Sequence, residues 1–320
     1  MSIRIRPRWY LPEREVTPES QYLGRRDFLK GVGAGLLSVG AASAGLLGCM
    51  RSGYTAAPPT HLLTGGARRN PKYTLDRPLT DEKVAATYNN YYEFTTDKEG
   101  VADAAKDFKT LPWSIEVGGL CAKPRKWDLT ELVKAMPIEE RVYRHRCVEA
   151  WSMAVPWTGF QLSHLLKLAE PQSTARFVRL VSVDRPNEMI GMREQKWYPW
   201  PYFEGLRLDE AMNELAFLVT GIYGHDLPPQ HGAPLRLAMP WKYGYKSPKA
   251  IVKIELSATQ PPTFWNSLSA AEYGFESNVD PKKPHPRWSQ AHERVIGSGE
   301  RRATLLYNGY AEYVASLYKG

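Results

Sequence analysis

The chain has 320 residues and a formal net charge of +8, from 42 Lys and Arg against 34 Asp and Glu. The first 48 residues hold seven of the basic and four of the acidic side chains, so the remainder carries only +5. That modest excess, with no Lys/Arg run along one helical face and no recognition motif, gives no indication of a nucleic-acid partner. The remainder is long enough for one large domain or two small ones, each with a hydrophobic core.

Residues 1–48 have the features of an export signal. Arg25 and Arg26 stand in the sequence Gly-Arg-Arg-Asp-Phe-Leu-Lys, ahead of a Gly-rich apolar run over 31–48 that is short for a membrane-spanning helix. This twin-arginine pattern predicts export to the periplasm of an already folded protein, as an enzyme with an inserted cofactor requires. The signal ends either at a cleavage site in Ala42–Ala44 or at Cys49, which would then carry a lipid anchor.

The rest of the chain divides into a tether and one folded domain. Residues 49–80 are rich in Pro, Gly, Thr and basic residues and are predicted to form an extended tether or arm, with the folded domain over 81–320. Helices are predicted at 81–86, 128–136, 160–169 and 209–214, and strands at 113–117, 141–147, 176–183, 234–239 and 251–257. No βαβ rhythm with a Gly-rich phosphate loop is present, which favours an α+β or mainly β fold.

Two of the predicted helices carry specific expectations. Asp128 is the expected N-cap of the helix over 128–136, which Pro137 ends. The helix over 160–169 is amphipathic. Its inward-facing residues are expected to be Leu162, Leu165, Leu166 and Leu168.

Cys147 is the residue that indicates chemistry most directly. It follows Arg144, His145 and Arg146, and because nearby positive charge favours the thiolate, the sequence predicts a lowered thiol pKa. A thiolate binds soft metals or attacks electrophiles. Two alternatives are a buried structural cysteine and a disulfide with Cys121, which an oxidising compartment would allow.

Four motifs resemble one enzyme family. They are Tyr-Asn-Asn-Tyr-Tyr-Glu-Phe at 88–94, Arg-Cys-Val-Glu-Ala-Trp-Ser-Met at 146–153, Pro-Pro-Gln-His-Gly-Ala-Pro-Leu-Arg at 228–236 and Pro-Trp-Lys-Tyr-Gly-Tyr-Lys at 240–246. In order, and over essentially all of residues 80–319, the chain resembles the catalytic subunits of periplasmic protein-methionine-sulfoxide reductases, which are molybdenum enzymes of the sulfite oxidase fold superfamily. The resemblance implies a mixed, β-rich α+β domain that binds molybdenum–molybdopterin.

The resemblance also implies a set of site residues. Cys147 would be the catalytic residue, as the single protein ligand to molybdenum, and a soft thiolate suits that metal beside the dithiolene sulfurs of the pterin. The pterin phosphate and ring edge would be held by an arginine, whose planar fork matches phosphate oxygens, and by a short loop. The implied cofactor contacts are Asn89, Tyr92, Glu93, Ser182, His231, Arg236, Ser247, Pro248 and Lys249.

The implied activity is reduction of methionine sulfoxide in oxidised periplasmic proteins, with electrons from a haem-containing membrane subunit linked to quinol. A sulfite oxidase-type oxygen-atom transferase is the alternative in the same chemistry, because sulfite oxidases resemble this chain in carrying His at the position of His231. Two alternatives need no metal. One is an exported binding module that holds damaged proteins on its aromatic surfaces, and the other is a thiol reductase using Cys121 and Cys147, although no C-x-x-C motif is present. The aromatic loop at 197–202 is expected either to pack or to line the mouth where a protein substrate docks.

Overall fold

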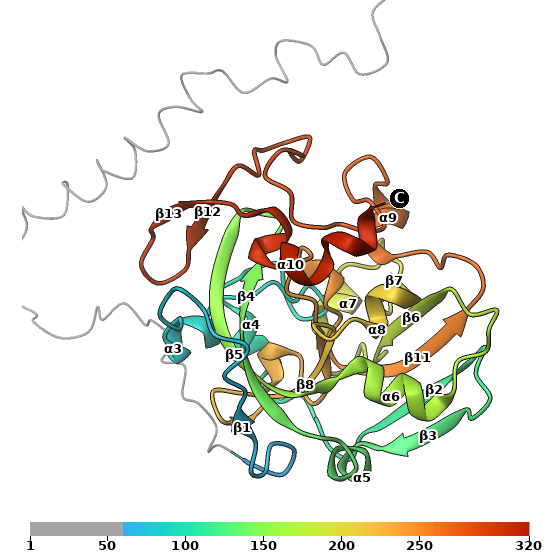
Figure 1. Ribbon diagram of the computed structural model, residues 1–320. Coiled ribbons are helices and arrows are strands. Elements are labelled where there is room, and N and C mark those ends of the chain that lie inside the picture. The colour runs from blue at the N-terminus through green and yellow to red at the C-terminus, as the bar shows by residue number, and fades with distance from the viewer. Residues whose placement is uncertain (1–59, 320) are drawn as a thin grey trace, which may run out of the picture. The chain divides into compact units, whose positions relative to one another are not determined.

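The computed structural model describes residues 60–319, and its strands form two sheets (Figure 1). The signal peptide predicted over 1–48 and the candidate lipid-anchor residue Cys49 lie outside the described residues. The larger sheet contains β1 (Arg68–Arg69), β4 (Glu139–Arg146), β5 (Trp151–Gln161), β8 (Phe217–Ile222), β9 (His225–Asp226), β10 (Arg236–Ala238), β12 (His292–Val295) and β13 (Arg301–Ala303). The smaller sheet contains β2 (Ser114–Gly119), β3 (Arg125–Asp128), β6 (Phe177–Ser182), β7 (Phe203–Arg207) and β11 (Ile251–Ser257).

Both sheets mix parallel and antiparallel pairs. The larger runs β1-β4-β5-β12-β13, and β8 pairs with β5, β9 and β10. Its longest ladder is the antiparallel β4–β5 pair, in which His145 lies opposite Met153 and Arg146 opposite Ser152. The smaller runs β3-β2-β11-β6-β7, with β11 parallel to β2 and antiparallel to β6. The predicted β-rich α+β class is confirmed.

The helices of the described chain are short. The α-helices are α3 (Glu82–Ala86), α4 (Val101–Ala105), α5 (Leu129–Lys134), α6 (Leu162–Ala169), α7 (Ile190–Glu194), α8 (Leu208–Met212), α9 (Phe264–Leu268) and α10 (Ala311–Val314). Single 3-10 turns are η2 (Pro229–His231), η3 (Gly244–Lys246), η4 (Leu306–Gly309) and η5 (Ala315–Tyr318). Between residues 60 and 319, no helix combines the length and the apolar composition needed to cross a bilayer.

Local sequence signals locate many of these elements. The five predicted strands correspond to β2, β4, β6, β10 and β11, and the predicted helices to α3, α5, α6 and α8. Asp128 caps α5 as expected, because its Oδ1 accepts hydrogen bonds from the backbone N–H groups of Thr130 and Glu131 at 2.8 and 3.1 Å. The inward orientation expected for Leu168 is wrong. Its side chain is 45% exposed, since the buried face of α6 follows Leu162, Leu165 and Leu166.

The other strands of the described chain were not predicted, and the longest of these are β5, β7 and β8. β5 and β8 are buried on both faces, so their residues do not alternate between apolar and polar types. The prediction depends on that alternation, and a continuous apolar run can equally belong to a buried helix.

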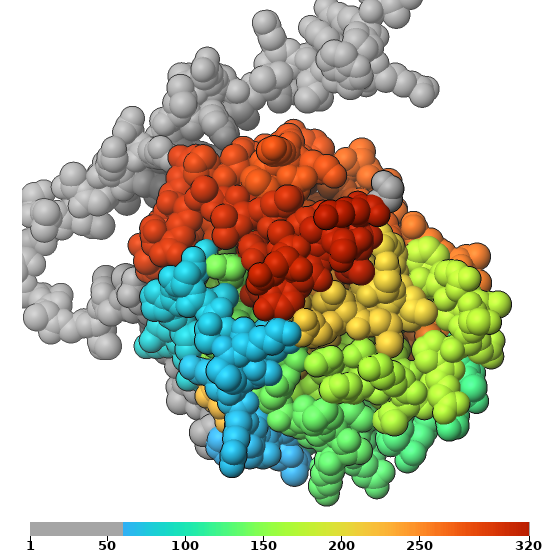
Figure 2. Space-filling view, in the orientation of Figure 1, coloured from blue at the N-terminus to red at the C-terminus, as the bar shows by residue number. Residues whose placement is uncertain are grey.

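The described part of the predicted arm packs on the larger sheet. β1 pairs in parallel with β4, and the Asp226 carboxylate accepts hydrogen bonds from Thr60 Oγ1 and from the Leu62 and Leu63 backbone N–H groups, each at 2.8 Å. In Figure 2 the blue and cyan surface of residues after 60 lies beside the dark red surface of the C-terminal residues. Tyr73 and Tyr313 make this contact, with ring centroids 6.5 Å apart. The domain boundary near residue 80 stays a prediction.

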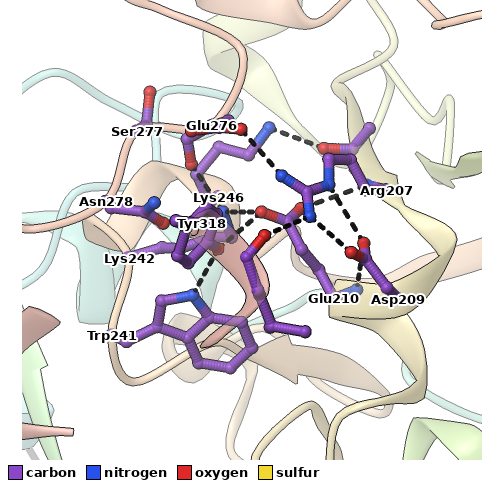
Figure 3. A network of polar contacts seen from close by, with 12 residues as sticks. Arg207, Asp209, Glu210, Trp241, Lys242, Lys246, Glu276, Ser277, Asn278 and Tyr318 are labelled. Atoms are coloured by element: carbon purple, nitrogen blue, oxygen red, sulfur yellow. Dashed lines mark hydrogen bonds and ion pairs between the residues drawn. The ribbon is translucent and has the colours of Figure 1, made fainter. Parts of the chain in front are cut away.

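A buried polar network holds the C-terminal residues to the protein interior (Figure 3). Lys242 Nζ lies 2.6 Å from Glu210 Oε1, and both side chains are almost completely buried. The Tyr318 hydroxyl donates to the same Oε1 at 2.6 Å and accepts from Trp241 Nε1 at 2.8 Å. These paired groups satisfy one another, as buried charges and polar groups must.

Candidate active site

Cys147 lies in the turn that joins β4 to β5. The backbone N–H of Ala150 donates to the Cys147 carbonyl at 3.1 Å, and Ala150 adopts a positive φ of 62°, which closes the turn before Trp151 begins β5. Because β4 and β5 form a long antiparallel ladder, this turn is held rigidly at one end of it. The sequence correctly predicts a strand that ends at Cys147.

The thiol of Cys147 is buried among polar groups. Its Sγ lies 3.4 Å from Asn90 Nδ2, 3.5 Å from the Glu149 backbone N and 3.9 Å from Glu149 Oε2. Asn90 Nδ2 also donates to Glu149 Oε2 at 2.9 Å, so the three side chains form one cluster. Burial, followed by the negative charge of Glu149, raises the pKa of the Cys147 thiol to about 12. The predicted lowered pKa is therefore wrong for the protein without a metal.

The cationic neighbours of Cys147 in the sequence face elsewhere in the structure. Arg144 donates to Asp76 at 2.7 Å, and the buried guanidinium of Arg146 lies 3.3 Å from a Glu293 carboxylate oxygen. Burial, then the charges of Arg236 and Lys249, lowers the pKa of His145 to about 3, so this imidazole is neutral. The charge of Arg146 still favours the thiolate, but burial and the charge of Glu149 outweigh it.

A cavity of about 360 Å³ opens beside Cys147. Its polar wall comes from the segment 89–93, the turn 147–149 and the loop 247–249, together with Arg236 at the start of β10. The rest of the wall is largely aromatic and includes Tyr198, Tyr202, Phe264, Trp265, Tyr273 and Trp288. Segments far apart in the sequence therefore meet around one thiol.

Two cations in this wall have no carboxylate hydrogen-bond partner within the described chain. Arg236 is 3% exposed, and its Nη1 donates to the His231 carbonyl at 3.0 Å. Lys249 is half-buried, and its Nζ contacts Asn89 Oδ1 at 3.3 Å and the Asn90 carbonyl. Burial lowers the pKa of Arg236 to about 10, and burial together with the Arg236 charge lowers the pKa of Lys249. The charge of Glu93 acts in the opposite direction on Lys249, but neither cation is hydrogen-bonded to a carboxylate of the described chain, and such cations favour an anionic ligand.

Hydrogen-bonding capacity is also left open beside the two cations. In the described part of the chain, Asn90 Oδ1 and the Tyr91 hydroxyl are buried without a partner, and both residues line the cavity. Buried polar atoms are normally satisfied, so an unpaired acceptor and an unpaired hydroxyl here indicate a polar ligand.

Eight of the ten predicted site residues line the cavity, and two lie behind it. Ser182 Oγ donates to the Lys249 carbonyl at 2.7 Å, which fixes the backbone of the lysine. His231 is buried, and its Nδ1 lies 3.4 Å from Asn89 Nδ2. The lining residues are Asn89, Tyr92, Glu93, Cys147, Arg236, Ser247, Pro248 and Lys249.

Sequence reasoning missed several lining residues. Asn90 and Glu149 both stand inside motifs that were singled out, but only their contacts with Cys147 Sγ reveal a place in the site. In the aromatic loop at 197–202, Tyr198 and Tyr202 line the cavity, whereas Trp197 is 69% exposed. Arg287 and Trp288 reach the cavity from a segment that lies outside the four motifs.

The two cysteines of the described chain do not act together. Both are free and buried, and Cys121 is not among the residues that line the cavity. The disulfide alternative is therefore wrong, and the wall holds a single thiol. Within residues 60–319, no group of three His, Cys, Asp or Glu side chains could hold a metal ion, so a metal here would depend on a ligand beyond the protein.

The chain is similar to known proteins in its sequence and in its structure. The oxidoreductase molybdopterin binding domain family matches residues 102–265. The protein-methionine-sulfoxide reductase catalytic subunit MsrP of Burkholderia mallei is 45% identical over 316 residues, which cover 97% of this chain and 93% of that protein. The sulfane dehydrogenase SoxCD of Paracoccus pantotrophus aligns with a TM-score of 0.44 and 14% identity, over 84% of this chain and 64% of that one.

Proposed function

We propose that this chain reduces methionine sulfoxide in proteins to methionine with molybdenum–molybdopterin. It belongs to the family of protein-methionine-sulfoxide reductase catalytic subunits with an oxidoreductase molybdopterin binding domain. One observation carries the proposal. A single cavity joins the Cys147 thiol to two cations, Arg236 and Lys249, that lack a carboxylate hydrogen-bond partner among the described residues.

The cavity wall fits the organic part of this cofactor. Arg236 and Lys249 would neutralise its phosphate, and Arg236 would donate to phosphate oxygens through its fork. Asn90 Oδ1 and the Tyr91 hydroxyl, both buried without a partner in the described structure, would bond to the polar edge of the pterin. Asn89 lies within reach of Lys249 Nζ at 3.3 Å, and Ser247 and Pro248 complete this side of the wall.

Cys147 would be the protein ligand to the metal. A metal ion deprotonates a coordinating thiol, which removes the effect that burial has on this pKa. The resulting thiolate would accept hydrogen bonds from Asn90 Nδ2 and from the Glu149 backbone N–H, which already lie 3.4 and 3.5 Å from Sγ. These donors hold the sulfur in place and stabilise its negative charge.

When bound, the molybdenum centre would supply two electrons and accept the sulfoxide oxygen. The chain's own residues would prepare the site for this chemistry. The aromatic wall would exclude water and contact the sulfur of the substrate, since thioether sulfur packs well against rings. Glu149 Oε2, 3.9 Å from Cys147 Sγ and 3.2 Å from Lys98 Nζ, would hold the Asn90 amide and the Lys98 ammonium beside the sulfur.

Location and electron supply are further parts of the proposal. The twin-arginine pattern at Arg25 and Arg26 supports export to the periplasm, where oxidised proteins would be the substrates. The matched relative is named a catalytic subunit, which supports a partner, and we propose a haem-containing membrane subunit as electron donor. A lipid on Cys49 would keep the enzyme near that partner. Replacing Cys49 with Ala should then release the protein from membranes with its activity intact, and unchanged membrane retention would contradict the anchor.

The test compares two cysteine variants of the chain expressed with its signal in a host that makes the pterin. Wild type and Cys121→Ser should each hold about one molybdenum per chain and reduce oxidised protein with a dye donor, whereas Cys147→Ser should lose the turnover. A metal-free wild type that still reduces sulfoxides, and that either substitution inactivates, would establish the thiol mechanism instead. Sulfite oxidation without sulfoxide reduction would establish the sulfite oxidase-type alternative.

A further inference from the structure

The cavity wall carries two arginines with very different exposure. Arg236 is 3% exposed and belongs to the closed part of the site, whereas the Arg287 side chain is 59% exposed. Both line the same cavity. Arg236 therefore lies in the buried part of the cavity, and Arg287 lies where the cavity meets solvent.

Arg287 is held in place with donors to spare. Its Nη2 donates to Glu272 Oε2 at 2.7 Å and lies 3.4 Å from the Tyr273 hydroxyl, and its guanidinium lies 4.9 Å from the centre of the Trp288 ring. Both bonds use Nη2. The N–H groups of Nε and Nη1 are therefore open to a ligand, so far as the described residues show.

The position of Arg287 is tied to the turn that carries Cys147. Trp288 Nε1 donates to the carbonyl of Val148, the residue after Cys147, at 2.7 Å. The Trp288 ring stacks on His285 with centroids 3.8 Å apart, and His285 Nε2 lies 3.3 Å from Glu272 Oε2. The ion pair and the stacked rings therefore hold the guanidinium at a fixed place relative to the thiol.

Substrate and product of the proposed reaction differ in one property that a guanidinium can recognise. The sulfoxide oxygen is a strong hydrogen-bond acceptor, whereas a thioether sulfur is a weak one. The aromatic wall contacts both molecules through their apolar groups and so distinguishes them little. A charged donor at the mouth adds affinity for the sulfoxide alone.

We propose that Arg287 donates a hydrogen bond to the sulfoxide oxygen of the entering substrate and so makes the site prefer methionine sulfoxide over methionine. This inference rests on the proposed function. It assigns to Arg287 a substrate-binding role, and it explains how the product leaves, because the reduced side chain offers only a weak acceptor.

The test measures inhibition of sulfoxide reduction by two peptides that the holoenzyme cannot reduce. One contains methionine sulfone, which keeps oxygen acceptors, and the other contains methionine. In the wild type, the sulfone peptide should inhibit at an about tenfold lower concentration, as one hydrogen bond to a charged donor provides. In Arg287→Gln this preference should disappear, KM for the sulfoxide peptide should rise about tenfold, and inhibition by the methionine peptide should stay unchanged.

Two further variants separate binding from structure. Arg301→Gln, at an exposed arginine of β13, is the matched control and should keep wild-type KM and preference. Arg287→Lys keeps the charge and should restore part of the preference. A residue with only a structural role would instead change the melting temperature and leave the preference for the sulfone peptide over the methionine peptide unchanged. Melting temperature and molybdenum content, measured on each variant, report on folding.

The outcomes distinguish this inference from the function beneath it. An Arg287→Gln enzyme that keeps the wild-type KM and the wild-type preference for the sulfone peptide would overturn the proposed role of Arg287. Wild-type values in Arg287→Lys as well would confirm that Arg287 has no such role. A molybdenum-loaded wild type that reduces no sulfoxide would refute the proposed function itself.

Discussion

Cys147, Arg236 and Lys249 line the same cavity, so the charge on each depends on what fills it. Without an anion, burial works against every charged form and moves the pKa of the thiol up and those of the two cations down. A bound phosphate would stabilise both cations. At the scale of single residues, the charged forms of the two cationic side chains are therefore stabilised when an anionic ligand is bound.

His231 provides a pH test of this environment. Burial, then the charge of Arg236, lowers its pKa to about 3, whereas an unfolded histidine has a pKa of about 6.5. The folded state binds the proton less well, so the contribution to stability is full above pH 6.5 and is lost as pH falls from there toward 3. Well below pH 6.5, each such histidine adds about 1.4 kcal/mol per pH unit to the slope of the free energy of unfolding against pH.

We therefore expect His231→Gln in the cofactor-free protein to lose stability less steeply than wild type between about pH 6.5 and 5, by about 1 kcal/mol per pH unit on average, because an unfolded histidine is only half protonated at pH 6.5. Urea unfolding at several pH values measures the slope. Subtracting the two curves cancels the other titrating groups. Parallel curves would show that His231 is protonated as easily in the folded protein as in the unfolded chain.

At the scale of elements, the helix α7 fixes the segment that forms the polar wall. Gly191 lies so close to this segment that a Cβ there would stand 2.2 Å from the Tyr92 carbonyl oxygen and 2.8 Å from the Glu93 carbonyl carbon. The Met192 backbone N–H donates to the Glu93 carbonyl at 3.2 Å. Only glycine allows this approach, so α7 sets the position of residues 89–93.

Gly191→Ala should therefore displace the wall. We expect a loss of about 1–3 kcal/mol in the free energy of unfolding, as for overpacked sites, together with reduced retention of the cofactor. Gly274→Ala is the matched control, because a Cβ at that position meets no atom within 4 Å. Denaturant unfolding and molybdenum content are the measurements, and equal values for the two variants would contradict the argument.

At the scale of the whole molecule, the described chain depends on a few buried ion pairs. Lys242 with Glu210 and Lys246 with Glu204 are nearly inaccessible to water and join segments about thirty to forty residues apart. Removing one partner of such a pair leaves a buried, uncompensated charge. Exposed pairs such as Lys123 with Glu170 are screened by solvent and contribute little.

Lys242→Met should therefore destabilise the protein by about 3–5 kcal/mol, while Lys123→Met should change the free energy of unfolding by less than about 1 kcal/mol. The Tyr318 hydroxyl also bonds to Glu210, so the loss should loosen the C-terminal residues first. Denaturant unfolding gives the two energies, and protease sensitivity of the C-terminal end locates the effect. Equal energies for the two variants would be inconsistent with a structural role for the buried network.

Sequence patterns among neighbouring residues are enough to predict some of the helices and strands. Asp128 caps α5 because capping involves only neighbouring residues, and strands such as β2 and β6 show in alternating patterns. The motifs around Cys147 and Arg236 indicate the family and its cofactor class through their resemblance to a known enzyme family. The α+β class and a strand leading into Cys147 follow from local patterns.

Tertiary structure decides what depends on residues far apart in the chain. The thiol pKa is raised rather than lowered because burial and then the negative charge of Glu149 outweigh the charge of Arg146, which pairs with Glu293. Ser182 and His231 lie behind the wall, whereas Arg287 reaches its mouth from a distant segment. Burial and charge at a site are sums over everything packed around it, and no local pattern contains that sum.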